Sequence, residues 1–191
     1  MDETGRKPRE PRDKKPRKVS PRYLENAALH YLKRYSATVT QLKRVLMRRV
    51  DRSVRAHGGE RAEAVGWVDA LVEKLMRNGL INDQAYAETR AHSLRASGRS
   101  SRVIAQKLKL KGVAPDVVAS KVAQASAELP EEAAARIWAR KKRLGPFRRD
   151  LATRKDQRQK DLAAMARAGF PFALAKKVID GTAEEPPDGR V

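Results

Sequence analysis

Three groups of basic side chains are the residues in this sequence best suited to do chemistry, and that chemistry is the binding of polyanions. Lysine and arginine attract phosphates and carboxylates over long distances, and arginine can hold either group through two hydrogen bonds. The groups are Lys43, Arg44, Arg48, Arg49 and Arg52; then Arg90, Arg95, Arg99 and Arg102; then Arg140, Lys141, Lys142, Arg143, Arg148 and Arg149. Lys107, Lys109 and Lys111 add charge just after the second group.

The second group surrounds a predicted break between two helices at Gly98. The helix that begins near Ser101 has backbone N–H groups at its start, and these, beside several arginines, suit a phosphate or a carboxylate. The first group follows the polar face of one helix, and the third is concentrated around a turn. Lysine and arginine also occupy solvated helix faces in many proteins, so a purely structural role stays open as the alternative. None of the groups indicates base-specific recognition.

The chain as a whole is strongly basic. It carries 43 Lys and Arg against 23 Asp and Glu in 191 residues, a formal net charge of +20. The excess lies in the folded part as well as in the N-terminal tail, since residues 23–130 hold 19 basic and 10 acidic side chains. We therefore expect a docking surface for nucleic acid or for an acidic protein groove, with a generally basic soluble protein as the plain alternative.

Chemistry other than binding finds little support in the residues. The sequence has no cysteine, which excludes disulfides, thiolate metal sites and a cysteine nucleophile. His30, His57 and His92 lack ligand spacing, and the acidic residues form no pair suited to acid–base catalysis. Tyr86 and Trp138 are interpreted as packing anchors, because aromatic and basic residues do not alternate as they do in base-stacking surfaces. We predict a protein that is not an enzyme and binds no cofactor or metal.

The elements that position the basic groups are predicted to be helices. The hydrophobic share of 40% leans on Ala, Leu and Val, and the aromatic content is 5%, which favours an all-α protein. Helical spacing of apolar residues, with glycines at the stops, predicts nine helices. We expect an elongated, curved array of three tandem three-helix repeats. The predicted boundaries are a disordered basic arm at 1–19, repeats at 20–78, 79–128 and 129–180, and a tail at 181–191.

The stretch from Leu75 to Tyr86 combines a helix stop with a helix start and is predicted to join the first repeat to the second. Gly79 can adopt the left-handed conformation that ends a helix, Asn82 can cap the next helix, and Asp83 suits its first turn. The apolar pair after Gly79 is expected to pack back across the break. The predicted structural hinge residues are Gly79, Leu80, Ile81, Asn82, Asp83, Tyr86, Gly112 and Gly169.

Several helix faces and ends follow from the apolar pattern. The third helix bears the cleanest apolar stripe, which runs from Val65 to Met76. The seventh helix is expected to bury Ile137 and Trp138 and to end at Gly145–Pro146. The eighth is expected to span about 149–168. There is no apolar run of about 18 residues and no signal peptide, so we predict a cytoplasmic protein.

Three segments together are similar in order and spacing to the RecX family of recombination regulators. They are Gly79–Ala87, Gly98–Ile104 with Leu108 and Lys111–Val113, and Ala168–Phe172, and the likeness covers roughly residues 22–180. Asn82 stands where the family usually has a second Asp, and Asn caps a helix equally well. The resemblance implies a small non-enzymatic protein that binds the RecA recombinase filament on DNA and limits its assembly or activity in recombination and DNA repair.

Two further expectations accompany this resemblance. We expect the protein to act as a monomer that touches single- or double-stranded DNA through its basic faces. The alternative, which the charge alone supports, is an autonomous architectural DNA- or RNA-binding protein of tandem helical repeats.

Overall fold

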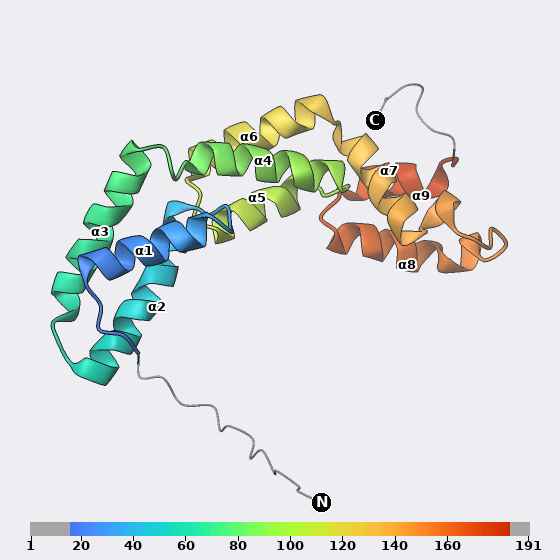
Figure 1. Ribbon diagram of the computed structural model, residues 1–191. Helices are drawn as coiled ribbons and strands as arrows, with labels where there is room; N and C mark the ends of the chain where they lie inside the picture. The colour runs from blue at the N-terminus through green and yellow to red at the C-terminus, as the bar shows by residue number, and fades with distance from the viewer. Residues whose placement is uncertain (1–15, 184–191) are drawn as a thin grey trace, which may run out of the picture. The chain divides into compact units, whose positions relative to one another are not determined.

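The structure is a computed structural model that describes residues 16–183, and within that range it contains helices and no strand (Figure 1). The prediction of an all-α protein is confirmed for this part of the chain. Most of the predicted basic arm, residues 1–15, and the last residues, 184–191, lie outside the described residues. No helix in the described range is long and apolar enough to cross a membrane. The helices are α1 (Pro21–Leu32), α2 (Val39–His57), α3 (Arg61–Arg77), α4 (Asp83–Ala96), α5 (Ser101–Leu110), α6 (Pro115–Glu128), α7 (Glu131–Lys142), α8 (Arg154–Arg167) and α9 (Phe172–Asp180), with a 3-10 helix η1 (Gly145–Phe147) between α7 and α8.

Side-chain caps define several of the helix starts. The Ser20 hydroxyl accepts a hydrogen bond from the Tyr23 N–H at the start of α1. Asn82 accepts from two N–H groups in the first turn of α4, and Ser100 accepts from one in α5. These bonds satisfy N–H groups that have no partner within their own helix. The predicted capping role of Asn82 is confirmed.

The described chain divides into two compact units at the predicted hinge. One holds the residues up to Tyr35 and Leu42–Leu80, and the other holds Ser36–Gln41 and the residues from Ile81 onward. Gly79 has a φ of 67°, and the next N–H donates to the Leu75 carbonyl at 2.9 Å, which ends α3. Ile81 is buried, but Leu80 is 51% exposed, so the expectation that both pack across the break is wrong for Leu80. Successive side chains of an extended segment point in opposite directions.

The start of α2 belongs to the second unit and is bound there through polar contacts. The Val39 N–H donates to Asp83 Oδ1 at 2.9 Å, and the Thr38 hydroxyl donates to the Lys111 carbonyl at 2.6 Å. Asp83 therefore caps the first residue of α2 as well as opening α4. The chain passes so close at Gly112 that a Cβ there would lie 2.3 Å from Thr40 Oγ1.

In the first unit, α3 turns a narrow apolar stripe inward. Ala64, Val68, Leu71 and Leu75 are buried along it, whereas Met76 is 49% exposed. Each residue advances about 100° around a helix, which places Met76 off the centre of the stripe. The predicted stripe is therefore correct from Val68 to Leu75, only half-buried at Val65, and wrong at Met76.

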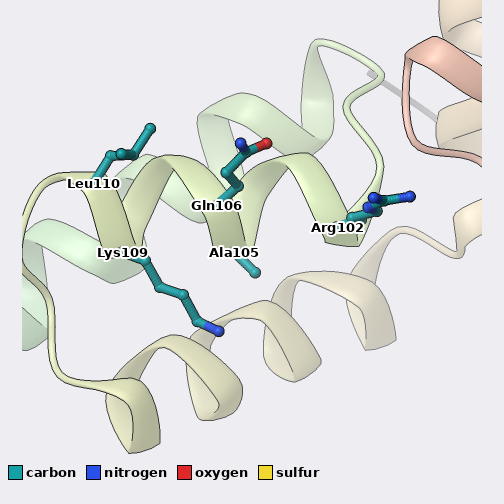
Figure 2. Close-up of a pocket in the computed structure, with 5 residues that line it drawn as sticks. All are labelled: Arg102, Ala105, Gln106, Lys109 and Leu110. Atoms are coloured by element: carbon teal, nitrogen blue, oxygen red, sulfur yellow. The ribbon is translucent and has the colours of Figure 1, made fainter.

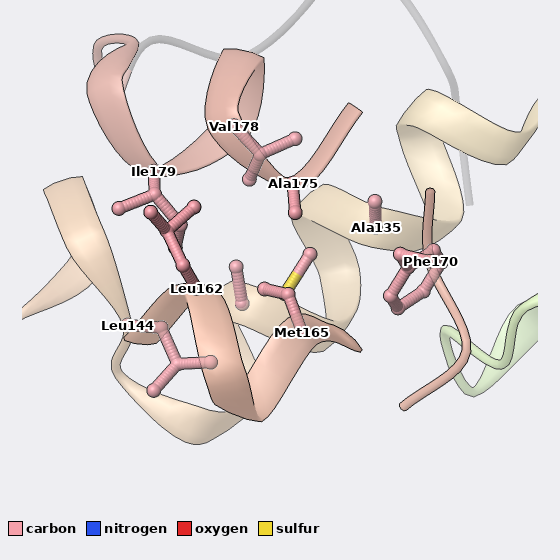
Figure 3. Close-up of a cluster of buried hydrophobic side chains, with 9 residues drawn as sticks. Ala135, Leu144, Leu162, Met165, Phe170, Ala175, Val178 and Ile179 are labelled. Carbon is pink, nitrogen blue, oxygen red and sulfur yellow. The ribbon is translucent and has the colours of Figure 1, made fainter. Parts of the chain in front are cut away.

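Within the described residues, the second unit holds two separate clusters of buried apolar side chains. Helices α4, α5 and α6 surround one, which consists of Ala87, Ala91, Leu94, Ile104, Leu108, Val113, Val118 and Ala125. Helices α7, α8 and α9 surround the other, which includes Leu162, Met165, Phe170, Val178 and Ile179 (Figure 3). Burial at such positions is the main source of stability for helices of this length.

Helix α7 buries alanines rather than the large residues that the sequence pattern indicates. Ala134, Ala135 and Ala139 are buried, Trp138 is partly buried against the second cluster, and Ile137 is exposed. Small side chains on this face allow α7 to lie close to the turn at Gly98. The prediction of burial is therefore wrong for Ile137 and correct in part for Trp138.

The connection from α7 to α8 also differs from the prediction. Helix α7 ends at Lys142, and Arg143 takes the left-handed conformation with a φ of 56°. Asp161, which is 2% exposed, accepts hydrogen bonds from the Gly145 N–H at 2.8 Å and from two nitrogens of Arg148 at 2.6 and 2.9 Å. These bonds hold Arg148 outside the helix, so α8 begins at Arg154 rather than near residue 149.

Acid is expected to weaken the second unit through its surface ion pairs. Two hydrogen bonds of 2.7 Å from Arg158 lower the pKa of Asp180. A folded-state pKa below the unfolded value gives stability at neutral pH that is lost as the pH falls below about 4. Asp180→Asn should therefore reduce stability slightly at pH 7 and flatten its decline toward pH 3 in urea unfolding. Asp116→Asn, which changes an exposed carboxylate on α6, is the control, and equal slopes for the two variants would contradict the assignment.

Candidate functional site

The first basic group lies on α2, and several of its members bind within their own unit. Lys43 pairs with Asp69 at 2.7 Å, and Arg49 donates to the Tyr23 hydroxyl at 3.1 Å and lies over that ring. Arg52 donates back to the carbonyl of Arg48 at 3.3 Å. The side chains of Arg44 and Arg48 are exposed. This face therefore offers fewer uncommitted charges than the sequence indicates.

The second basic group is divided, because Arg95 is buried. Its side chain is 2% exposed and donates to Glu131 at 2.6 Å, to the Ser101 hydroxyl at 2.5 Å, and to the Ser126 hydroxyl. It also donates to the carbonyl of Arg99 at 3.2 Å. The prediction that Arg95 belongs to an exposed contact surface is wrong, since its charge is neutralised inside the unit. Arg90, by contrast, is exposed on α4.

Glu131 occupies the anion position that the sequence predicts at the start of α5. The Ser101 N–H donates to its carboxylate at 3.0 Å, and the Ser101 hydroxyl donates at 2.6 Å. A carboxylate at a helix N-terminus is favoured by the helix dipole and by the unpaired N–H groups. The chemistry predicted for this position is therefore used within the chain itself. Glu131 was not among the predicted residues, because it lies 30 residues after Ser101 and no local pattern relates the two.

Trp138 connects the second and third basic groups. The guanidinium of Arg99 lies 4.4 Å from the centroid of the Trp138 ring, and the ammonium of Lys142 lies 5.3 Å from it. Both distances are within the range of cation–π attraction. We call Arg99, Arg102, Trp138 and Lys142 the Trp138 surface. The sequence indicated Trp138 only as a packing residue, and it both packs and positions cations.

The exposed side of α5 continues the positive charge. Arg102, Ala105, Gln106, Lys109 and Leu110 line an open hollow of about 520 Å³ (Figure 2). Arg102, Gln106 and Lys109 are spaced by four and three residues, so they share one face of the helix. Among the described residues no carboxylate lines this hollow, and Leu110 is 67% exposed beside it. Lys107 and Lys111 are also exposed on or beside α5.

The third basic group is partly committed to structure. Arg148 is bound to Asp161, and this hydrogen bonding raises the pKa of the guanidinium. Arg148 therefore has a structural role within the unit, and its predicted external contact stays a prediction. Arg140 lies 5.2 Å from the Phe147 ring centroid. The remaining members are exposed and lie around the left-handed turn: Lys141, Lys142, Arg143 and Arg149.

The general class of this protein is therefore an all-helical protein whose small units expose basic side chains. The family whose sequence model matches residues 82–120 is described as RecX, second three-helix domain. Regulatory protein RecX of Myxococcus xanthus (strain DK1622) is 72% identical over 167 residues, which cover 87% of this chain and 89% of that protein. Regulatory protein RecX of Agrobacterium fabrum is 34% identical over 166 residues, 87% and 86% of the two chains. No solved structure matches this chain.

The chain therefore belongs to the RecX family. The resemblance based on the segments at Gly79, Gly98 and Gly169 is confirmed. The matched range 82–120 includes α4, α5 and the start of α6, so the exposed face of α5 lies within the part of the chain that the family model describes.

Proposed function

We propose that this protein is a non-enzymatic regulator that binds the RecA recombinase filament on DNA and limits its assembly, ATPase and strand-exchange activity. Membership of the RecX family carries the proposal, above all the 72% identity to the Myxococcus xanthus protein over 87% of the chain. A nucleoprotein filament presents phosphates and acidic side chains, and a net charge of +20 would speed encounter with it. Tandem three-helix repeats would place several basic faces on one chain.

The proposal predicts inhibition at low protein ratios. Substoichiometric protein should slow the DNA-dependent ATPase of RecA and its strand exchange, because each bound molecule would affect neighbouring subunits of a filament. Both rates can be followed with purified RecA on single-stranded DNA at several protein ratios. Unchanged rates at every ratio would contradict the proposed function.

The second candidate is an autonomous architectural nucleic-acid-binding protein, and the exposed cations of α5 are the observation that favours it. It predicts tight binding to bare nucleic acid with a steep dependence on salt. The regulator predicts weak binding to bare nucleic acid and strong binding when RecA is present. A pull-down on immobilised DNA with and without RecA distinguishes the two.

A further inference from the structure

We propose that Arg99 and Lys142, which both lie against the ring of Trp138, and the exposed Arg102, three residues after Arg99, bind consecutive phosphates of a single nucleic-acid strand. The inference rests on the proposed function, in which the protein acts on a filament that contains DNA. It assigns the nucleic-acid contact to the Trp138 surface and to the adjoining face of α5. It also makes Trp138 the residue that reports binding.

Arg99 is held in place before any ligand arrives. Its guanidinium lies against the Trp138 ring, and its carbonyl accepts a hydrogen bond from the buried Arg95. A guanidinium that lies over an aromatic face keeps its N–H edges for hydrogen bonding to an anion. Ordering a long side chain in advance lowers the entropic cost of binding. Arg99 is therefore suited to hold a phosphate with two hydrogen bonds.

The positive charge of this surface is not neutralised within the described chain. Arg99, Arg102 and Lys142 form no ion pair with a carboxylate there, whereas Lys43 on α2 pairs with Asp69. Glu131, the carboxylate bound at the start of α5, already accepts hydrogen bonds from Arg95 and Ser101. The surface therefore attracts an external anion.

A nucleic-acid backbone fits this arrangement better than an acidic peptide does. Lys109 extends the charge along α5, about 10 Å beyond Arg102 at 1.5 Å per residue, so the surface suits an anion with regularly repeated charges. Two cations face the ring of Trp138, so it is not an open platform for a base. Binding should therefore depend on phosphates and not on base identity.

Fluorescence can test the site, because the sequence has two tryptophans. In a Trp67→Phe background, Trp138 is the only one, and its emission should change as a thymidine oligonucleotide of about 20 residues is added. Arg99→Gln with Lys142→Gln should weaken binding at least tenfold. It should also reduce the slope of log K against log salt by about 1.4, since each phosphate contact on a single strand contributes about 0.7.

A matched control removes two charges elsewhere on the same unit. Lys155→Gln with Lys160→Gln changes two exposed lysines of α8, and binding should weaken far less than in the Arg99 and Lys142 variant. Circular dichroism of both variants should match the parent. Equal losses in the two variants, or oligonucleotide binding without any change in Trp138 emission, would overturn the proposed site. An equal response to poly-glutamate would overturn the choice of nucleic acid as the ligand.

The RecA assay separates this inference from the proposed function. If the parent slows the RecA ATPase and the Arg99 and Lys142 variant still binds oligonucleotide normally, the phosphate site is wrong and the function stands. If the parent leaves RecA unaffected and the variant loses oligonucleotide binding, the site stands and the proposed function is wrong.

Discussion

Replacing Arg95 with methionine is expected to lower the free energy of unfolding of the second unit by about 3 kcal/mol, since loss of one partner from a buried ion pair costs on the order of 3–5 kcal/mol. Methionine preserves much of the volume but donates no hydrogen bond. Glu131 would then keep its contacts with Ser101 and lose its counter-charge. Its side chain is 28% exposed, and solvent access places the expected cost at the lower end of that range.

The size of this effect follows from what Arg95 connects. Its partners come from the start of α5, the end of α6 and the first turn of α7, and Arg95 itself lies in the last turn of α4. The terminal nitrogens of Arg95 make all of these hydrogen bonds, while its buried Nε has no partner among the described residues. Removal of the central donor leaves several polar groups without their partner at the same moment.

Urea unfolding followed by Trp138 fluorescence in the Trp67→Phe background would measure the loss in the unit that contains Arg95. Arg90→Met is the matched control, because Arg90 is exposed on the same helix, and it should change the free energy of unfolding by less than about 0.5 kcal/mol. Glu131→Gln added to Arg95→Met should recover part of the loss, since the unpaired charge is removed. Equal free energies of unfolding for Arg95→Met and Arg90→Met would show that the hydrogen-bond network of Arg95 contributes nothing to stability.

Local chemistry was enough to predict the helices and many of their ends. Ser20 and Asn82 cap where their types and positions indicate, because a cap depends on residues three positions apart at most. The hinge at Gly79 follows from the same kind of information, and the two units meet in sequence there. Family likeness was also visible at these turns.

The distribution of the basic residues between interior and surface was not predictable in the same way. Arg95 and Arg148 are as polar as Arg90 and Arg149 in the sequence, yet the first two are neutralised by Glu131 and Asp161. These partners lie 36 and 13 residues away, and only packing brings them together. The number of charges therefore predicts that the chain binds an anion. It does not tell which basic residues stabilise the fold and which are available for binding.

Replacing Gly98 with alanine is expected to cost about 3 kcal/mol, considerably more than the same change at Gly79. Both glycines have positive φ angles, 81° and 67°, so alanine carries a conformational cost of roughly 1–2 kcal/mol at either position. At Gly98 a Cβ would also lie 2.8 Å from the Trp138 backbone nitrogen and 3.0 Å from the Ala134 carbonyl oxygen. At Gly79, no atom of the described part of the chain lies within 4 Å of such a Cβ.

The difference in free energy of unfolding between Gly98→Ala and Gly79→Ala measures how closely α7 approaches the turn between α4 and α5. Two of the three nearest atoms that oppose a Cβ at Gly98 belong to the backbone of α7, and the third is the Ile137 Cγ2 methyl at 2.9 Å. The backbone atoms cannot rotate away as a side chain would, so the helix or the turn must shift. Such a shift would also separate Arg99 from Trp138, so Gly98→Ala should weaken oligonucleotide binding while Gly79→Ala leaves it intact. Urea unfolding and the Trp138 titration test both statements. If Gly98→Ala proved no more costly than Gly79→Ala and bound oligonucleotide normally, the close approach of α7 would not be what positions Arg99.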